Sequence, residues 1–245
     1  MNYERQQQNM SISLYCFHHA GGSASSYLPW KTDMGPDIQV CPVQLPGRGS
    51  LYNEDLIIDF GVLIERLSKI FLAENSLPFA FFGHSLGGLV AFELCHFLKR
   101  QSLPMPKHLF ISGTNPPIFH PPSPRRPKDD ESLIERLKAY EGTDEQIFKN
   151  KEFMEMVLPV FRADLMLIES YHYQSRQQLA LPLTLLTGKS DEYLQHDRLS
   201  VWGLETSSDF EHYLFEGGHF YIQSRKNAVL QLIRQKLLNI PPSLE

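Results

Sequence analysis

The 245-residue sequence has little cysteine, no long apolar run and no excess of basic residues. Three cysteines cannot all pair with one another, and Cys16, Cys41 and Cys95 lie in apolar segments, which favours a reducing compartment. No apolar run approaches the roughly 20 residues that a membrane-spanning helix requires. Residues 1–10 also lack the basic and then apolar pattern of a secretory signal. We therefore expect a cytoplasmic protein that is neither exported nor inserted into a membrane.

Acidic residues outnumber basic ones, 28 to 23, and the formal net charge is −5, so the sequence carries no electrostatic footprint for nucleic acid. The one basic cluster, Arg125, Arg126 and Lys128, is followed at once by acidic residues at 129–131, which is typical of a solvated loop. With 42% hydrophobic and 21% charged residues, the composition is that of a globular protein and excludes a disordered or fibrous one.

Short apolar runs alternate with stretches of helical periodicity along most of the chain. The predicted strands are 12–17, 38–43, 79–82, 108–112, 183–187 and 212–215. The predicted helices include 54–74, 86–100 and 226–238. This alternation predicts an α/β fold with an open, mostly parallel sheet covered by helices. In such folds ligands bind at the carboxyl ends of the strands, so functional motifs are expected just after strands.

The alternation breaks after Gly113, where a proline-rich loop at 116–127 precedes two or three helical segments. Apolar residues recur at helical spacing within 134–140 and 153–168. Such helices could simply pack on the sheet, or they could form a lid over a site at its edge. We predict one domain over the whole chain, with a helical lid inserted at about 114–180.

The sharpest motif is Gly-x-Ser-x-Gly at 83–87, which follows an apolar strand and precedes a helical run. A serine at a tight strand-to-helix turn needs small neighbours, and Gly83 and Gly87 supply them. Ser85 would project above the sheet as a nucleophile, and the Leu86 N–H at the helix start would face a developing negative charge. The alternative is a glycine turn with an incidental serine, but the strand before the motif and the helix after it favour a nucleophile elbow.

A serine nucleophile requires a base, and ten histidines compete for that role. His219 is the best candidate, because it follows the predicted strand at 212–215 and precedes the last helix. His84 adjoins the nucleophile, but adjacent residues at an elbow point in different directions, so we expect it to support the turn. His96 and His172 lie in predicted helical segments, where packed or exposed histidines are usual.

The base in turn needs an acid that fixes its tautomer. Asp191 follows the fifth predicted strand, and Glu192 and Asp197 are its rivals in the same region. With Asp191, the chain order is Ser85, Asp191, His219, which is the order found in α/β hydrolases and not that of chymotrypsin or subtilisin folds.

The loop after the first predicted strand is rich in glycine and histidine. The Ala20 N–H is a candidate second oxyanion donor, since Gly21 and Gly22 allow close backbone approach, although a plain glycine turn is an equal reading of the sequence. His18 and His19 have no complementary cluster of metal ligands at a recognisable spacing. The two glycines match neither a phosphate-binding loop nor a dinucleotide fingerprint. We therefore expect no metal and no cofactor.

Five motifs occur in a fixed order along nearly the full length of the chain. They are His19-Ala20-Gly21-Gly22-Ser23-Ala24 with Tyr27, Pro46-Gly47-Arg48-Gly49, Gly83-His84-Ser85-Leu86-Gly87-Gly88, Gly188 to Asp191, and Gly217-Gly218-His219-Phe220. With these motifs the chain resembles the type II, or editing, thioesterases of nonribosomal peptide and polyketide synthases, which have an α/β-hydrolase fold. The Pro-Gly-Arg-Gly segment separates this family from generic esterases, whereas the elbow alone does not.

The resemblance implies that Ser85 is the nucleophile, that Asp191 and His219 are its partners, and that the amides of Ala20 and Leu86 form the oxyanion hole. It also implies hydrolysis of an acyl thioester on the phosphopantetheine arm of an acyl carrier or peptidyl carrier protein, which edits misprimed or stalled units. The phosphopantetheine belongs to the substrate protein, so no cofactor of this chain is implied.

The first loop departs from the family, whose members usually carry proline where His18 stands. Carrier proteins are typically acidic, and the basic cluster Arg125, Arg126 and Lys128 could compensate for the net negative charge of this chain. We expect a monomer without nucleic-acid or membrane partners. Two alternatives stay open at this point, namely a general carboxylesterase or lipase acting on small free esters and a noncatalytic binding module that retains the fold.

Overall fold

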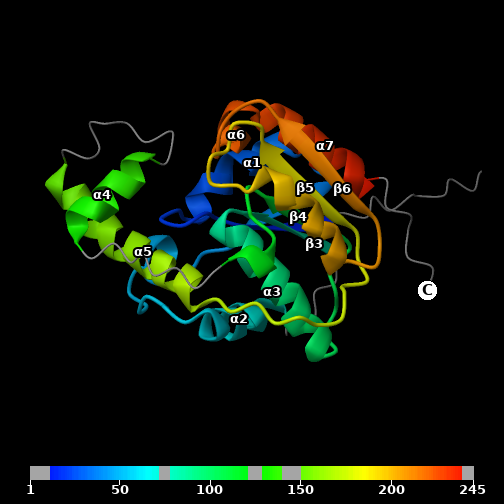
Figure 1. Ribbon diagram of the computed structural model, residues 1–245, viewed down its shortest axis with the longest axis horizontal. Coiled ribbons are helices and arrows are strands. Elements are labelled where there is room, and N and C mark those ends of the chain that lie inside the picture. The colour runs from blue at the N-terminus through cyan, green and yellow to red at the C-terminus, as the bar shows by residue number, and fades with distance from the viewer. Residues whose placement is uncertain (1–11, 72–77, 121–128, 140–149, 239–245) are drawn as a thin grey trace, which may run out of the picture.

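A parallel six-stranded sheet forms the centre of the protein, as the alternating pattern predicts (Figure 1). The computed structural model describes residues 12–71, 78–120, 129–139 and 150–238. The strands are β1 Ile12–Phe17, β2 Ile38–Pro42, β3 Phe79–His84, β4 Leu109–Ser112, β5 Leu183–Gly188 and β6 Phe210–Phe215. They are ordered β2-β1-β3-β4-β5-β6, and every neighbouring pair is parallel. All carboxyl ends therefore meet at one edge of the sheet.

The strands are apolar on both faces because helices cover both faces. In β3, Phe81 packs into one hydrophobic cluster and its neighbour Phe82 into the other, as expected for side chains that alternate across a strand. The same alternation separates Phe110 from Leu109 and Ile111 in β4. All five side chains are fully buried, so the sheet is the middle layer of a three-layer core.

The helices form the two outer layers (Figure 1). Helices α1, α6 and α7 lie on one face, and α2 and α3 lie on the other. The α-helices are α1 Leu28–Asp33, α2 Phe60–Ser68, α3 Leu86–Arg100, α4 Asp130–Ala139, α5 Lys151–Ser170, α6 Tyr221–Ser224 and α7 Lys226–Leu238. Short 3-10 helices occupy Ala24–Tyr27, Gly49–Leu51, Lys69–Phe71, Pro117–Phe119 and His196–Glu205.

The predicted helix at 54–74 is wrong at its start. Helix α2 begins only at Phe60, after Asp59, whose side chain accepts a hydrogen bond from the Val62 N–H and so caps the helix. Residues 55–59 have no regular structure, although their apolar residues continue the helical spacing. A 3-10 turn, Lys69–Phe71, extends α2, and the end of the prediction lies outside the described residues.

Along the chain, helices α4 and α5 come between β4 and β5, where the sequence predicts an insertion. In Figure 1, α4 extends away from the sheet, whereas α5 runs back toward α2. Asn150 caps α5 by accepting a hydrogen bond from the Phe153 N–H. Of the predicted lid at about 114–180, residues 121–128 and 140–149 lie outside the described residues, and with them the basic cluster Arg125, Arg126 and Lys128. The lid assignment stays a prediction.

No helix in the described ranges is both long and apolar enough to cross a membrane. The three cysteines are free thiols, with Cys16 and Cys95 buried and Cys41 half-buried.

Candidate active site

Ser85 lies at a sharp turn between β3 and α3. Its backbone has φ 56° and ψ −119°, a conformation in which a residue with a side chain is strained. The turn is held in place because the Ser85 N–H donates to the Ser112 carbonyl at 2.8 Å and the Gly88 N–H donates to the Ser85 carbonyl at 2.9 Å. This is the geometry of a nucleophile elbow.

The two glycines of the motif leave no room for side chains. A Cβ atom on Gly83 would lie 2.0 Å from the Gly87 carbonyl oxygen, and one on Gly87 would lie 2.1 Å from the Phe17 carbonyl oxygen. The second contact shows that the end of β1 passes directly against the start of α3. The glycines are thus required for close backbone packing on both sides of Ser85.

Asp191 and His219 meet although 28 residues separate them in the sequence. The Nδ1 atom of His219 lies 2.7 Å from Oδ2 of Asp191, and both side chains are buried. An ionised carboxylate only accepts hydrogen bonds, so Nδ1 carries the proton and Nε2 is left as the basic nitrogen. The second carboxylate oxygen, Oδ1, accepts the Tyr193 N–H at 3.0 Å. The two rivals for the acid, Glu192 and Asp197, are exposed.

Gly113, just after β4, lies between the residues of the two loops and brings His219 next to the Ser85 turn. Gly113 has φ +57°, and a Cβ atom there would lie 2.8 Å from Cε1 of His84 and 3.4 Å from Cε1 of His219. The rings of His84 and His219 lie with their centroids 5.0 Å apart. Since His84 immediately precedes Ser85, these contacts place the loop of His219 against the turn that carries Ser85.

The first loop carries the other predicted oxyanion donor. Ala20 is buried, and Gly21 beside it has φ +76° and donates its N–H to Oδ2 of Asp164 at 2.7 Å. Phe161, on the same helix as Asp164, packs on Gly21, where a Cβ atom would lie 3.1 Å from its ring. Leu86 is the first residue of α3, so its N–H has no carbonyl partner within the helix. Because the end of β1 packs against the start of α3, the N–H groups of Ala20 and Leu86 lie on neighbouring segments of the chain.

A buried ion pair anchors this loop to α5. Arg48, in the Pro-Gly-Arg-Gly segment, forms hydrogen bonds of 2.5 and 2.7 Å to the two carboxylate oxygens of Asp164. The Arg48 side chain is 7% exposed and that of Asp164 is 0% exposed. In the sequence, Arg48 is recognisable only as part of the family motif. Asp164 was not predicted as a site residue, because no motif marks it within the apolar stripe of α5.

His84 belongs to a second buried polar cluster. Its Nδ1 atom lies 2.9 Å from the Ser112 hydroxyl, which in turn lies 2.6 Å from the Tyr221 hydroxyl. All three side chains are buried. Burial, followed by the neighbouring His219 and His19, holds the pKa of His84 well below its usual range. The His84 ring is therefore neutral and has a structural role. Through Ser112 it is connected to Tyr221, the first residue of α6.

Four other histidines are those that the sequence singles out, namely His18, His19, His96 and His172. Burial lowers the pKa values of His18 and His19 to about 3, so both are neutral near pH 7. His96 is buried in α3 as predicted, whereas His172 is not in a helix but lies just after the end of α5. The carbonyl of Ser170, the last residue of α5, lies 2.8 Å from its Nδ1. Among the residues that the structure describes, no group of three or more His, Cys, Asp or Glu side chains could hold a metal ion.

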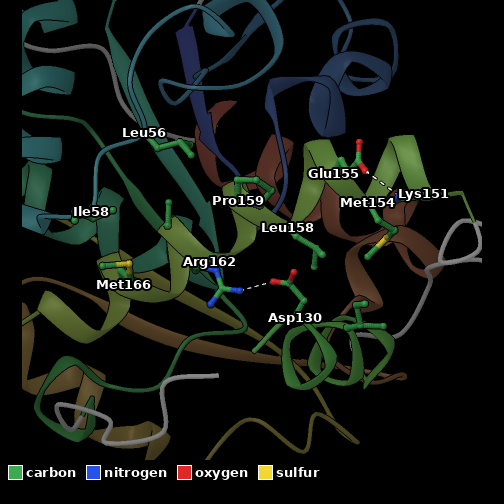
Figure 2. Close-up of a pocket in the computed structure, with 12 residues that line it drawn as sticks. Leu56, Ile58, Asp130, Lys151, Met154, Glu155, Leu158, Pro159, Arg162 and Met166 are labelled. Carbon is green, nitrogen blue, oxygen red and sulfur yellow. Dashed lines mark hydrogen bonds and ion pairs between the residues drawn. The ribbon is translucent and has the colours of Figure 1, made fainter. Parts of the chain in front are cut away.

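An apolar cavity of about 640 Å³ lies between α4, α5 and the segment before α2 (Figure 2). On α5, its lining residues Leu158, Arg162 and Met166 recur every four residues and so share one helix face. Phe161 and Asp164, which contact the first loop, lie on another face. Neither Ser85 nor His219 lines the cavity.

The parallel sheet, the strained serine elbow and the buried acid–base pair define an α/β hydrolase. A family model described as "Thioesterase domain" matches residues 12–237, which is nearly the whole chain. The chain belongs to the thioesterase family.

Individual relatives agree with this assignment in sequence and in structure. Linear gramicidin dehydrogenase LgrE of Brevibacillus parabrevis is 36% identical over 232 residues, covering 92% of this chain and 88% of the relative. The crystal structure of ClbQ from the colibactin NRPS/PKS pathway matches with a TM-score of 0.85 and 29% identity over 93% of this chain and 97% of ClbQ. The type II thioesterase BorB from the borrelidin biosynthetic cluster matches with a TM-score of 0.84 and 32% identity over 92% of each chain. The predicted α/β-hydrolase fold and the resemblance to type II thioesterases are confirmed.

Proposed function

We propose that this chain hydrolyses acyl thioesters on the phosphopantetheine arm of acyl or peptidyl carrier proteins, and so edits misprimed or stalled units during nonribosomal peptide or polyketide biosynthesis. The observation that carries the proposal is the buried hydrogen bond between His219 and Asp191 beside the strained Ser85 elbow. Membership of the thioesterase family supports thioester hydrolysis. ClbQ comes from an NRPS/PKS pathway and BorB is a type II thioesterase of a biosynthetic cluster, and both likenesses support the carrier-bound substrate.

In the proposed first step, the Ser85 hydroxyl attacks the thioester carbonyl while Nε2 of His219 takes its proton. The carbonyl oxygen becomes an oxyanion, which the N–H groups of Ala20 and Leu86 stabilise. His219 then protonates the departing phosphopantetheine thiolate, and an acyl-serine remains. Asp191 holds the imidazole in the required tautomer and stabilises its charged form.

In the second step, water attacks the acyl-serine. His219 takes a proton from the water and returns one to the Ser85 oxygen, which releases the free acid. Both steps use only side chains, backbone amides and water, so we propose no cofactor for this chain. The phosphopantetheine stays on the carrier protein.

The name of the relative LgrE contains the word dehydrogenase, which suggests a different reaction from hydrolysis, namely hydride transfer. Nucleotide-dependent hydride transfer commonly uses a Gly-x-Gly-x-x-Gly turn after a strand. The glycines at 21–22 after β1, and those at 83 in β3 and at 87 and 88 in α3, do not have this spacing. We therefore propose hydrolysis for this chain.

The test compares release of acetyl and longer acyl groups from a phosphopantetheinylated carrier protein with hydrolysis of a matched nitrophenyl ester. We would measure wild type, Ser85→Ala and a control variant, Ser207→Ala. Ser207 is a suitable control because it lies before the start of β6, at the edge of the sheet opposite Ser85. We expect Ser85-dependent release that favours the carrier-bound thioester, with Ser207→Ala like wild type. A preference for the free ester would assign the chain to the general esterases. Full activity of Ser85→Ala would refute the nucleophile, and no turnover of either substrate would indicate a binding module.

A further inference from the structure

One side chain from the end of β4 contacts the loop that carries Asp191, which backbone hydrogen bonds from Lys189 and Ser190 also join to the end of β6 and the segment after it. Asn115 donates from Nδ2 to the Tyr193 carbonyl at 2.8 Å, and its Oδ1 accepts the Gln195 N–H at 2.7 Å. One contact requires a donor and the other an acceptor, so together they fix which way the amide points. The Asn115 side chain thus acts as a short bridge to the backbone of the acid loop.

The segment that contains Asn115 also holds the nucleophile. This segment, 112–115, begins at Ser112, the last residue of β4, and continues beyond the strand. The Ser112 carbonyl accepts the Ser85 N–H at 2.8 Å, and the Thr114 hydroxyl donates to the Ser85 carbonyl at 2.9 Å. The Thr114 carbonyl in turn accepts the indole N–H of the fully buried Trp202 at 2.9 Å. The segment is therefore firmly anchored.

The two contacts of Asn115 act on the residues that orient the acid. Tyr193, whose carbonyl Asn115 holds, donates its own N–H to Oδ1 of Asp191 at 3.0 Å. The other oxygen, Oδ2, accepts the hydrogen bond from Nδ1 of His219. With one oxygen held by Tyr193, the carboxylate plane is set, and the second oxygen is directed at the imidazole. A shift of Tyr193 would rotate the carboxylate away from His219.

We propose that Asn115 is a positioning residue for catalysis, which holds the Asp191 loop in register with the Ser85 elbow through the backbone of Tyr193 and Gln195. This inference rests on the proposed triad and deepens it. Both side-chain hydrogen bonds of Asn115 go to backbone atoms of the Asp191 loop, so in this inference it acts through Asp191.

Removal of the bridge has a specific kinetic consequence. In Asn115→Ala the elbow keeps its own anchors in Ser112 and Thr114, so substrate binding is unchanged. The carboxylate of Asp191 becomes less well oriented and stabilises the imidazolium of His219 less. We expect kcat to fall about tenfold with an unchanged KM, the loss typical of one misplaced hydrogen bond to a charged group. The acid limb of the kcat/KM pH profile should move to lower pH, since a less stabilised imidazolium loses its proton at lower pH.

The control is Thr206→Ala. The Thr206 hydroxyl also binds backbone groups of a neighbouring segment, the carbonyls of Leu179 and Leu181, but it lies before β6 at the opposite edge of the sheet. This variant should lose stability without any shift of the pH profile. Asn115→Ser, which keeps a polar but shorter side chain, should show the same shift as Asn115→Ala and serves if the alanine variant folds poorly. Wild-type rates and profiles in both Asn115 variants would overturn the inference.

A double variant separates this inference from the triad itself. If Asn115 acts through Asp191, adding Asn115→Ala to Asp191→Ala lowers the residual turnover no further. An additional tenfold loss would show that Asn115 acts by another route and would refute the inference. Full activity of Asp191→Ala alone would instead refute the proposed acid. A strong loss in Asp191→Ala together with no effect of Asn115→Ala would leave the triad intact and reject only the bridge.

Discussion

Arg48 and Asp164 form a bidentate buried ion pair across 116 residues of sequence. Asp164 uses the same Oδ2 atom to accept the N–H of Gly21, so one carboxylate joins α5, the Pro-Gly-Arg-Gly segment and the first loop. Arg48 also donates to the Gly22 carbonyl at 3.4 Å. The helix that would belong to the lid is therefore fastened to the loop that carries a proposed oxyanion donor.

We predict that Asp164→Ala is strongly destabilising. The change leaves the Arg48 guanidinium buried without its counter-charge, and it removes the acceptor of the Gly21 N–H. The free energy of unfolding should fall by about 3–5 kcal/mol, the range for breaking a buried pair by removing one partner. Urea unfolding of the variant and of wild type measures the difference.

A surface pair provides the control for this experiment. Arg66 and Glu54 lie 3.0 Å apart, with side chains 43% and 38% exposed, so Glu54→Ala should cost at most about 1 kcal/mol. The double change Arg48→Met with Asp164→Leu should recover much of the loss, because no charge then stays unpaired. Equal effects of Asp164→Ala and Glu54→Ala would contradict the importance of the buried pair.

Gly87→Ala tests the close approach of β1 to α3. The new Cβ would lie 2.1 Å from the Phe17 carbonyl oxygen and 2.8 Å from that of His18, both of them backbone atoms that cannot rotate away. We expect a loss of about 1–3 kcal/mol of stability from overpacking, together with a large fall in turnover as the first loop is displaced. Gly61→Ala is the control, because its Cβ would meet only the Asp59 side chain, at 3.3 Å. Thermal unfolding and ester hydrolysis of both variants check the prediction.

Asp191→Asn tests the role of the acid in setting the tautomer of the base. The asparagine oxygen would keep the Tyr193 N–H, so its NH₂ group would face Nδ1 of His219 and force the proton onto Nε2. A His219 that is protonated at Nε2 cannot accept the Ser85 proton, so kcat should fall by about 10⁴ with a stable fold. Single-turnover kinetics and far-UV circular dichroism measure the two effects. Less than a tenfold loss would mean that another group fixes the tautomer.

The strands and the positions of Ser85, Asp191 and His219 at strand ends could be predicted from the sequence because their determinants are local. Strand β1 has the predicted bounds, and the strained φ of Ser85 follows from a glycine pattern within five residues. Asp191 and His219 could be paired before the structure because parallel strands end at one edge, which brings the following loops together.

The contacts that support these residues could not be predicted, because they depend on tertiary packing. Nothing near Asp164 in the sequence marks it as the partner of Arg48. Asn115 lies in the loop after β4, and the contacts of this loop depend on how the neighbouring strand ends pack together. The start of α2 was mispredicted for a related reason. Residues 55–59 keep helical apolar spacing, yet the cap at Asp59 determines where the helix begins.

The last prediction concerns pH and the buried His18. Burial, with the nearby positive charge of Arg48, lowers its pKa from an ordinary value of 6.5 to about 3. Between these two pH values the unfolded chain binds a proton at His18 that the folded protein does not bind. Acidification therefore favours unfolding, and this one histidine contributes a loss of about 1.4 kcal/mol per pH unit between about pH 6 and its folded pKa of about 3.

His18→Asn removes this titrating group and keeps a side-chain N–H that can donate to the His19 carbonyl, as Nδ1 of His18 does over 2.9 Å. Urea unfolding at pH 6, 5 and 4 should therefore show a shallower loss of stability in the variant than in wild type, by about 1.4 kcal/mol per pH unit. Near pH 7 the two proteins should differ much less, because His18 is neutral in both the folded and most of the unfolded molecules. Parallel curves for the two proteins would mean that His18 is protonated in the folded state, and that its burial beside Arg48 does not exclude the charge.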